Sequence, residues 1–375
     1  MKVMEEAQAG TLNPRDCQIS VAPGNGTVKV ASKTPSLYEE YIQNMVRGKL
    51  EEYGVEADVT VEENGAIDYV IMARLEAALV KATRNDMPDK KARRGKTAKD
   101  RPRRSRLYVP GNNPRFINSV AVYGCDCTML DLEDSVPLEQ KHDSRYLVKN
   151  ALQSMDFGRS EIWVRINKEL ASDDMRVITH GSPHGICVPK VESSEDIEVI
   201  EKIMAEANLD CHIMPILETA KGIANAREIA RASERVVALA FGAEDYTRDT
   251  GGRRTWDALM YPRFALLIAA KASGIQALDT IYPHIDDEEG LREETMRIVE
   301  MGFDGKGTIH PGQIEPIHEC FMPSPEEVEK AKQIISAIEE ARKSGDGVAT
   351  LDGRMIDLPV EMKARRVLKL AELYK

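Results

Sequence analysis

The chain has 375 residues, of which 42% are apolar and 30% are charged, and its formal net charge is −11. It contains no run of 18 or more apolar residues, which excludes a membrane-spanning helix of ordinary length. The first ten residues include two glutamates where a secretory signal would be apolar, so we expect a cytoplasmic protein. The six cysteines lack the spacing of a disulfide framework or a zinc site, and we expect buried or free thiols.

Residues 1–88 are predicted to form a small α+β domain. Apolar and β-branched residues at 17–23 and 27–32 predict two strands around the turn "GNG", and those at 57–63 predict a third strand. Apolar residues with helical spacing predict a helix over 36–53, ended by Gly54, and a second helix over 67–83.

A basic band separates this domain from the rest of the chain. Residues 81–106 carry 12 basic and 3 acidic side chains, a net charge of +9, whereas both flanking regions are acidic. The part at 89–103 lacks apolar periodicity and is predicted to be a linker. A nucleic-acid-binding arm is disfavoured because no aromatic residues are interleaved and the acidic flanks would repel a phosphate backbone. A third interpretation is that some of these charges meet the phosphates of a nucleotide-like cofactor.

Eight short apolar runs alternate with helical stretches after the linker. Parallel strands need such crossover connections, and eight units over about 270 residues fit a closed (β/α)8 TIM barrel. We therefore expect a barrel domain over 104–320, followed by a C-terminal helical extension or lid over 321–375. An open doubly wound sheet is the alternative fold. The runs lie at 106–111, 127–134, 162–167, 185–191, 211–218, 236–245, 277–283 and 307–311.

Acidic side chains end two successive runs of the predicted barrel. Catalytic groups of such barrels lie at the carboxyl ends of the strands, where Glu218 and Asp245 are expected. Carboxylates without histidine or thiolate favour Mg²⁺, with Mn²⁺ as an alternative. A solvated acidic rim or a salt bridge is the structural alternative. Glu244, beside Asp245, is expected to point the other way along the strand and to play a supporting part.

Cationic side chains end two other runs. Arg165 suits binding of a carboxylate or a developing enolate oxygen, and Lys190 ends the next run. A buried ion pair of Arg165 with Asp131, Glu133 or Asp134 is the alternative, and it is compatible with a catalytic role. These residue types together suit enolate chemistry on carboxylate substrates. They do not separate an aldolase from a lyase or an enolpyruvate enzyme.

Residues 103–375 resemble the citrate lyase β-subunit and malyl-CoA lyase family of aldolase-like (HpcH/HpaI) barrels. The resemblance rests on "RRSRLYVPGNN", "LDLEDSV" followed by Lys141, "VRIN", "VPKVES", "LETAKGI", "FGAEDY", "GFDGKGTIHPGQI" and "GRMIDLPV". It implies Mg²⁺-dependent, reversible carbon–carbon cleavage of a hydroxyacyl thioester, with citryl thioester giving oxaloacetate and an acetyl thioester. It also implies a homo-oligomer, and a citrate lyase α-subunit is a candidate partner.

The same resemblance implies roles for particular residues. Glu218 and Asp245 match the metal ligands, and Arg165 matches the catalytic arginine. These three side chains and Lys190 are expected to bind substrate, and Asp134 is a further catalytic candidate in the acidic cluster that supports Arg165. An acidic catalytic residue supplied by a neighbouring subunit matches Asp287, whose alternative is an acidic cluster at a helix N-terminus. An aspartate there favours malyl-CoA-type or hydrolytic chemistry.

Residues 8–82 resemble the acyl carrier γ-subunit of citrate lyase. The matching pieces are "AGTL", "APGNG", "GAID" and "ARLEAAL". That family attaches a CoA-derived group to a serine shortly after "AGTL", where this chain has Pro14. Because proline has no hydroxyl group, no residue is assigned to cofactor attachment, and the barrel is expected to use free CoA thioesters. The leading expectation is a citryl thioester lyase. The alternatives are a malyl-CoA or citramalyl-CoA lyase or thioesterase, and an N-terminal unit that is a docking module.

Overall fold

The computed structural model describes residues 1–33, 35–344, 349–351 and 354–373. The chain divides into two compact units, one of Met1–Asp286 with Met301–Ile314 and the other of Asp287–Glu300 with Glu315–Lys375. The first unit contains a small N-terminal domain and a barrel, and the second contains helices of the C-terminal region. Within the described residues, no helix has both the length and the hydropathy needed to cross a membrane.

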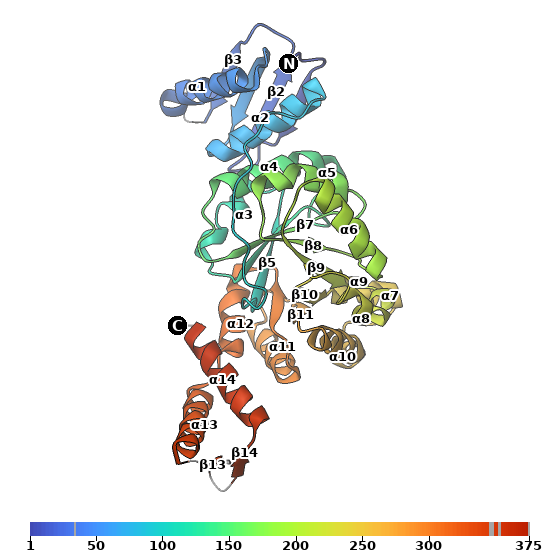
Figure 1. Ribbon diagram of the computed structural model, residues 1–375. Coiled ribbons are helices and arrows are strands. Elements are labelled where there is room, and N and C mark those ends of the chain that lie inside the picture. Colours follow the sequence, from blue (N-terminus) through green and yellow to red (C-terminus); the bar gives the residue numbers. More distant parts are fainter. Residues whose placement is uncertain (34, 345–348, 352–353, 374–375) are drawn as a thin grey trace. The chain divides into compact units, whose positions relative to one another are not determined.

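The N-terminal domain has a four-stranded sheet and two helices, as Figure 1 shows. Its strands, in the sheet order β1-β2-β4-β3, are β1 (Ala7–Gly10), β2 (Cys17–Ala22), β4 (Asp58–Glu63) and β3 (Val28–Ser32). The predicted strands and both predicted helices are present, but β4 lies between β2 and β3, which therefore do not pair with each other. β1 was not predicted from the sequence.

Two helices pack on this sheet. α1 (Pro35–Tyr53) contacts β3, and α2 (Asp68–Thr83) contacts β1 and β2. Gly54 follows α1 with a φ of 63°, a left-handed conformation that glycine adopts without strain. Most of α2 is buried because its second side packs against α4 of the barrel (Figure 1).

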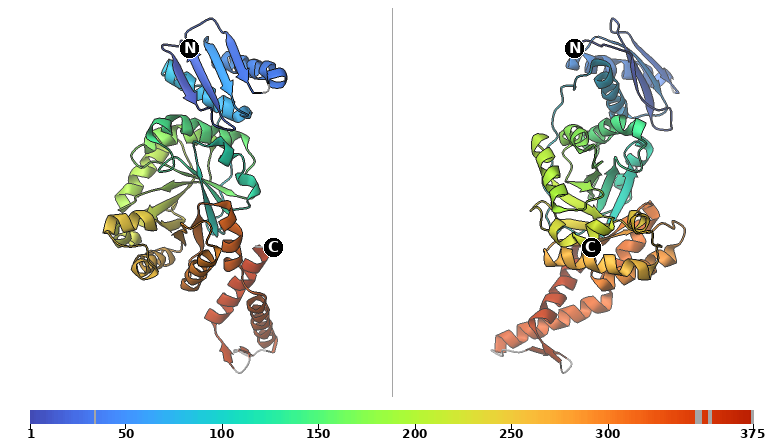
Figure 2. Two further views of the ribbon diagram at one scale, coloured as in Figure 1. Left: turned by 180° about the vertical axis from the view of Figure 1, so that it is seen from behind. Right: turned by 90° about the vertical axis from the view of Figure 1, so that its right-hand side faces the viewer.

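The eight strands of the barrel are all parallel and close on themselves, so the TIM-barrel prediction is confirmed and the open sheet is excluded. Each predicted apolar run overlaps one strand, because buried parallel strands are apolar on both faces. The strands are β5 (Ser105–Pro110), β6 (Cys127–Asp131), β7 (Glu161–Arg165), β8 (Gly185–Val188), β9 (His212–Leu217), β10 (Ala238–Phe241), β11 (Gln276–Ile281) and β12 (Gly305–Thr308). Figure 2 shows them from two further sides, with helices around them.

Helices of the barrel follow its strands. The longer ones are α4 (Lys141–Ser154), α5 (Ala171–Ile178), α6 (Ser194–Glu206), α9 (Ala243–Thr250) and α10 (Trp256–Ala272). The shorter ones are α3 (Pro114–Ile117), α7 (Ala220–Ala224), α8 (Ala226–Ile229) and the 3-10 turns η1 (Val120–Val122), η2 (Leu138–Gln140), η3 (Thr179–Gly181) and η4 (Pro311–Gln313).

A packed core fills the barrel. Trp163 on β7 is completely buried among inward-facing apolar side chains of the neighbouring strands, including Met129, Met214 and Leu278. Gly185 on β8 leaves room for its ring, because a Cβ at that position would lie 2.3 Å from a ring carbon. The catalytic groups must therefore lie above this core, at the strand ends.

The basic segment lies between the two domains and is fixed to the barrel by hydrogen bonds and ion pairs. Arg103 is completely buried and donates to both carboxylate oxygens of Glu161, at 2.6 and 2.9 Å, and to Gln276 at 2.7 Å. His212 bonds to the carbonyl of Thr97 at 2.9 Å. Because residues 161, 212 and 276 each begin a strand, the segment crosses the amino-terminal end of the barrel.

Other basic side chains of this segment pair with acidic groups of the barrel. Lys96 pairs with Asp210, and Lys99 pairs with Glu234. Part of the positive charge of the segment is thus paired within the chain. The six cysteines are all free thiols, and Cys320 alone among them is not fully buried.

The second unit is mostly helical, as expected for the C-terminal extension. It contains α11 (Glu288–Met301), α12 (Ile314–Phe321), α13 (Pro325–Ser344) and α14 (Leu358–Leu373), with the strands β13 (Ala349–Leu351) and β14 (Arg354–Ile356). α13 packs against α14, and Arg342 pairs with Glu361 at 3.1 Å across that contact. The unit is thus larger than the predicted extension, because α11 and α12 belong to it.

Candidate active site

Arg165, the last residue of β7, is held by carboxylates of the neighbouring strand end. Its Nε and Nη2 donate to the two oxygens of Asp131 at 2.6 and 2.7 Å, and its Nη1 lies 3.1 Å from Glu133. Although burial lowers the pKa of Arg165, these carboxylates raise it well above its usual range. The expected ion pair is present, formed by Asp131 and Glu133. Two of the five N–H groups of the guanidinium remain to face a substrate.

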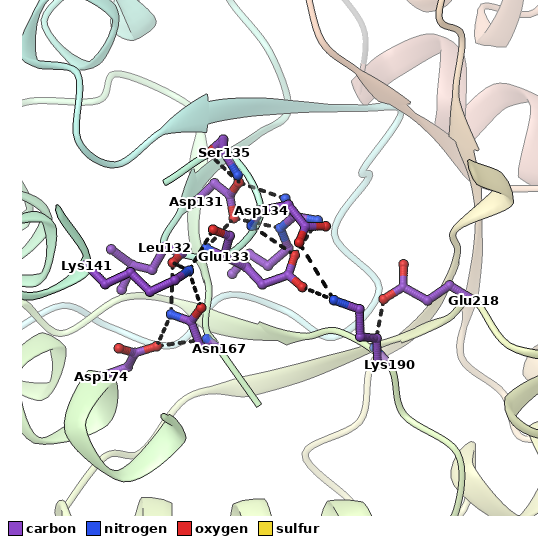
Figure 3. Close-up of polar contacts among 11 residues, drawn as sticks. Asp131, Leu132, Glu133, Asp134, Ser135, Lys141, Asn167, Asp174, Lys190 and Glu218 are labelled. Atoms are coloured by element: carbon purple, nitrogen blue, oxygen red, sulfur yellow. Dashed lines mark hydrogen bonds and ion pairs between the residues drawn. The ribbon is translucent and has the colours of Figure 1, made fainter. Parts of the chain in front are cut away.

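A second group of side chains fixes the backbone that carries Glu133, as Figure 3 shows. Lys141, at the start of α4, donates to the carbonyls of Leu132 and Glu133 at 2.9 and 2.8 Å and to Asn167 at 2.5 Å. Asn167 in turn donates to Leu132 O and to Asp174. This network keeps the β6 end rigid, which a preorganised cation site requires.

Lys190 connects the arginine side of the site to the Glu218 side. It follows β8 with a φ of 52°, a left-handed conformation that is unusual for a side-chain-bearing residue. This conformation lets its ammonium group pair with Glu133 while its backbone N–H donates to Glu218 at 2.8 Å. Figure 3 shows Lys190 between the two carboxylates. Its predicted place at the mouth is therefore observed, with its charge directed at Glu133.

Glu218 is a buried carboxylate that has no cationic partner within ion-pair distance among the described residues; its side chain is 3% exposed. It directly follows β9 and lies against Gly242, where a Cβ would be 2.4 Å from its Oε2. Burial and the charge of Asp245 raise the pKa of Glu218 to about 8. A cation bound beside Glu218 and Asp245 would favour the ionised carboxylates and so oppose this shift.

Asp245 and Glu244 lie in the first turn of α9 rather than at the end of a strand. The run at 236–245 was predicted to be extended throughout, but β10 ends at Phe241 and the helix begins at Ala243. The directions of these two carboxylates are therefore set by the rotation between successive residues of a helix and not by the alternation of a strand. Asp245 pairs with Arg248 and is mostly buried, whereas Glu244 is exposed and pairs with Arg254 at 2.8 Å. Helix N-termini favour carboxylates.

Glu218, Asp245 and Lys190 line one open cavity of about 750 Å³ in the first unit. Other polar side chains of its lining are Lys168, Glu192 and Asp249. No cluster of three or more acidic, histidine or cysteine side chains suited to a metal occurs in the described part of the chain. Two carboxylates nevertheless suit Mg²⁺, which usually takes one or two of them and fills its other positions with water and substrate oxygens.

Two further predicted catalytic residues have other contacts. Asp134 is more than half exposed and lies 3.7 Å from the Lys190 ammonium, and its backbone N–H donates to Glu133. Asp287 accepts from the N–H of Gly290 at 2.9 Å, at the start of α11 in the second unit. The catalytic roles of both remain predictions.

Sequence reasoning did not anticipate Arg106 or Tyr108 of β5. The ring of Tyr108 lies 5.1 Å from the Arg165 guanidinium carbon, a cation–π contact. Arg106 is buried inside the barrel, where it donates to the carbonyl of Asp279 at 2.6 Å. Residues 106 and 108 share one face of a strand, so the alternation of the run at 106–111 places both side chains on the inner face. In the sequence, however, an arginine at residue 106 indicates the boundary of a strand and not its buried interior.

This fold and these strand ends define a parallel-barrel enzyme of the aldolase type. A family model described as HpcH/HpaI aldolase/citrate lyase matches residues 104–311, and the chain belongs to that family. A second model, named ACP and described as malonate decarboxylase delta subunit (MdcD), matches residues 4–82. The resemblances inferred from the motifs are thus confirmed as a carbon–carbon lyase barrel with a carrier-type domain before it.

Curated relatives cover the barrel and the C-terminal region. The citrate lyase subunit beta of Leuconostoc mesenteroides subsp. cremoris is 41% identical over 72% of this chain and 94% of that subunit. The (3S)-malyl-CoA thioesterase of Cereibacter sphaeroides is 36% identical over 72% of this chain and 95% of that protein. The mitochondrial citramalyl-CoA lyase of Homo sapiens is 32% identical over 73% of this chain and 87% of that enzyme.

A solved structure agrees with the fold. The Mycobacterium tuberculosis CitE protein in complex with magnesium, acetoacetate and coenzyme A matches with a TM-score of 0.61 and 29% identity. The match covers 73% of this chain and all of that one.

Proposed function

We propose that this chain is a Mg²⁺-dependent lyase that cleaves citryl thioester to oxaloacetate and an acetyl thioester. One observation carries the proposal. A guanidinium fixed by two carboxylates lies in the same barrel mouth as the buried carboxylate of Glu218, which among the described residues has no cationic side chain within ion-pair distance. The first arrangement suits a developing enolate oxygen and the second suits a divalent ion.

The reaction breaks the bond between the hydroxyl-bearing carbon and the thioester's α-carbon. A base takes the hydroxyl proton, the C–O bond becomes the ketone of oxaloacetate, and the electron pair of the broken bond forms the enolate of the acetyl thioester. In this proposal N–H groups of Arg165 donate to the enolate oxygen. The enolate then takes up a proton at its carbon, which balances the proton taken by the base. Asp287 of a neighbouring subunit is the proposed base, Asp134 is a further catalytic candidate, and Lys190 is proposed to bind the substrate.

Glu218 and Asp245 are the residues that would hold Mg²⁺, with Mn²⁺ as an alternative. When bound there, such an ion supplies positive charge for the oxygens of an oxo acid. The solved relative that contains magnesium and coenzyme A supports this assignment. Lys190 supports it as well, because its N–H keeps the Glu218 carboxylate oriented.

Glu218→Ala tests the metal assignment. We expect the variant to lose metal-dependent cleavage while still folding cooperatively, because burial already disfavours the ionised form of this carboxylate. Glu244→Ala is the matched control, since it removes a neighbouring exposed carboxylate of α9. Unchanged turnover in the Glu218 variant would end the assignment.

The choice of thioester is the finer part of the proposal. The relatives named for citrate lyase, citramalyl-CoA lyase and malyl-CoA thioesterase support three candidates, and the β-subunit has the highest identity of the three. Side-by-side turnover of citryl-CoA, citramalyl-CoA and malyl-CoA decides between them. Release of free CoA without oxaloacetate or pyruvate would instead favour the thioesterase.

The N-terminal domain is proposed to be a carrier-type unit that no longer carries an arm. Pro14 stands where the resemblance expects a serine, and the Thr11 hydroxyl donates to Asp16 at 2.8 Å. We therefore propose free CoA thioesters as substrates, in the cytoplasm, with the chain acting as a homo-oligomer. Intact-mass measurement tests the missing arm, and co-purification tests a citrate lyase α-subunit partner, for which the domain would be the docking module.

A further inference from the structure

Asp143, in the first turn of α4, is one point where the N-terminal domain contacts the barrel. Its carboxylate accepts from the N–H of Gly10 at 3.2 Å and pairs with Lys81 of α2 at 2.6 Å. Arg74 of α2 donates to its backbone carbonyl at 3.4 Å. His142, its neighbour on α4, lies 3.0 Å from the same carboxylate. We call Asp143 and the three groups of the N-terminal domain the Asp143 clamp.

Arg74 is itself rigidly placed. It is 2% exposed and forms two 2.9 Å hydrogen bonds to the carboxylate of Asp16 within its own domain. It also donates to the carbonyl of Asn112, in the loop after β5, at 3.4 Å. The N–H of the Asn112 side chain donates to Gln140, the residue before α4, at 2.7 Å. The domain thus contacts the loop after β5 as well as the first turn of α4.

A second buried ionic contact holds the middle of α4. Lys149 is almost completely buried and pairs with Glu76 of α2 and with Asp89 of the basic segment, each at 2.5 Å. Together with the Asp143 clamp, it fixes α4 against α2 at two places about two helical turns apart. The helix therefore cannot shift along its axis without breaking buried ion pairs.

The start of α4 leads directly to the candidate active site. Lys141, two residues before Asp143, supports the carbonyls of Leu132 and Glu133. The Glu133 carboxylate contacts both Arg165 and Lys190. Lys81 and Arg74 are therefore connected to the guanidinium at the barrel mouth through polar contacts to Asp143, the first turn of α4, the Lys141 contacts to the Glu133 backbone, and the Glu133 carboxylate.

We propose that the N-terminal domain is an intramolecular brace for the active site, and that Asp143 is the positioning residue through which it acts. This inference rests on the proposed function for its kinetic consequence, but not for its structural one. By fixing the first turn of α4, the Asp143 clamp sets the position of Lys141 and hence of the Glu133 backbone. Small displacements of catalytic groups lower the reaction rate by large factors. The N-terminal domain therefore supports catalysis even without a prosthetic group.

The test uses the full chain. Lys81→Met removes the clamp's ammonium group on the N-terminal side, and Lys81→Arg keeps the charge. Arg84→Met is the matched control, because it removes an exposed ion pair with Glu5 in the same domain. Amide hydrogen exchange of the peptide covering 131–141, and kcat and KM for citryl-CoA, are measured for each protein.

We expect Lys81→Met to speed exchange in 131–141 and to lower kcat by about tenfold with little change in KM. Lys81→Arg should restore both, and Arg84→Met should change neither. Asp143→Asn should match Lys81→Met, and the double variant should be no worse than either single one, because both act on one contact.

Unchanged exchange in folded Lys81→Met and Asp143→Asn proteins would overturn the brace. Equal effects in Arg84→Met would overturn it too, since they would reflect general loosening of the domain. If exchange changes as expected while the wild-type protein turns over none of the three thioesters, the brace stands and the proposed function fails.

Discussion

Glu218→Gln should make the metal-free protein more stable at alkaline pH. Burial and Asp245 raise the pKa of this carboxyl group from 4.5 to about 8. Since its pKa is higher in the folded state, the folded protein favours the protonated form. The stability that this group contributes is complete below pH 4.5 and is lost as the pH rises to about 8.

The size of the effect follows from that difference in pKa. Each unit of that pKa difference corresponds to about 1.4 kcal/mol, so ionising Glu218 in the metal-free protein costs up to about 5 kcal/mol. Glutamine has the same shape, keeps an oxygen for the Lys190 N–H, and carries no charge. The variant should therefore lack this cost at every pH.

Urea unfolding in the presence of EDTA measures the difference between wild type and variant at pH 5, 7 and 9. We expect the two free energies of unfolding to be similar at pH 5 and the variant to exceed wild type by a few kcal/mol at pH 9. Glu244→Gln, which neutralises an exposed carboxylate, should follow wild type. Added Mg²⁺ should stabilise wild type and Glu244→Gln but not Glu218→Gln. Parallel curves for wild type and Glu218→Gln would refute the reasoning.

Three more predictions concern single side chains. Arg103→Met should lower the free energy of unfolding by about 3–5 kcal/mol, measured in urea, because it leaves buried Glu161 without its guanidinium. Gly242→Ala should abolish the increase in melting temperature caused by Mg²⁺, because the new methyl group would overlap the Glu218 carboxylate and displace it. Lys190→Gly should change stability by less than about 1 kcal/mol, because glycine accepts the left-handed backbone, but should lower kcat in steady-state assays.

The barrel was predictable because its signal is local. Buried parallel strands are short apolar runs, and polar residues at their ends mark the mouth, as Arg165 and Glu218 do. The same local reasoning failed after β10. There the apolar run continues into Gly242 and Ala243 without a break, so the start of α9 was missed. The direction of the Asp245 side chain depends on where α9 begins.

Features that depend on distant pairing could not be read from the sequence. Arg103 looks like one more charge in a solvated basic segment, and only Glu161, 58 residues later, explains its burial. The sheet order of the N-terminal domain is similar, since β4 inserts between strands that are adjacent along the chain. The left-handed backbone of Lys190 is set by the two carboxylates that it contacts, which the sequence places far apart.

The position of Arg103 bears on how this fused chain can be divided. The family match to the barrel begins at residue 104. A polypeptide that starts at this boundary lacks Arg103, the partner of Glu161 at the start of β7. Two separately expressed halves intended to recombine should therefore be cut upstream of the basic segment, leaving that strap attached to the catalytic half.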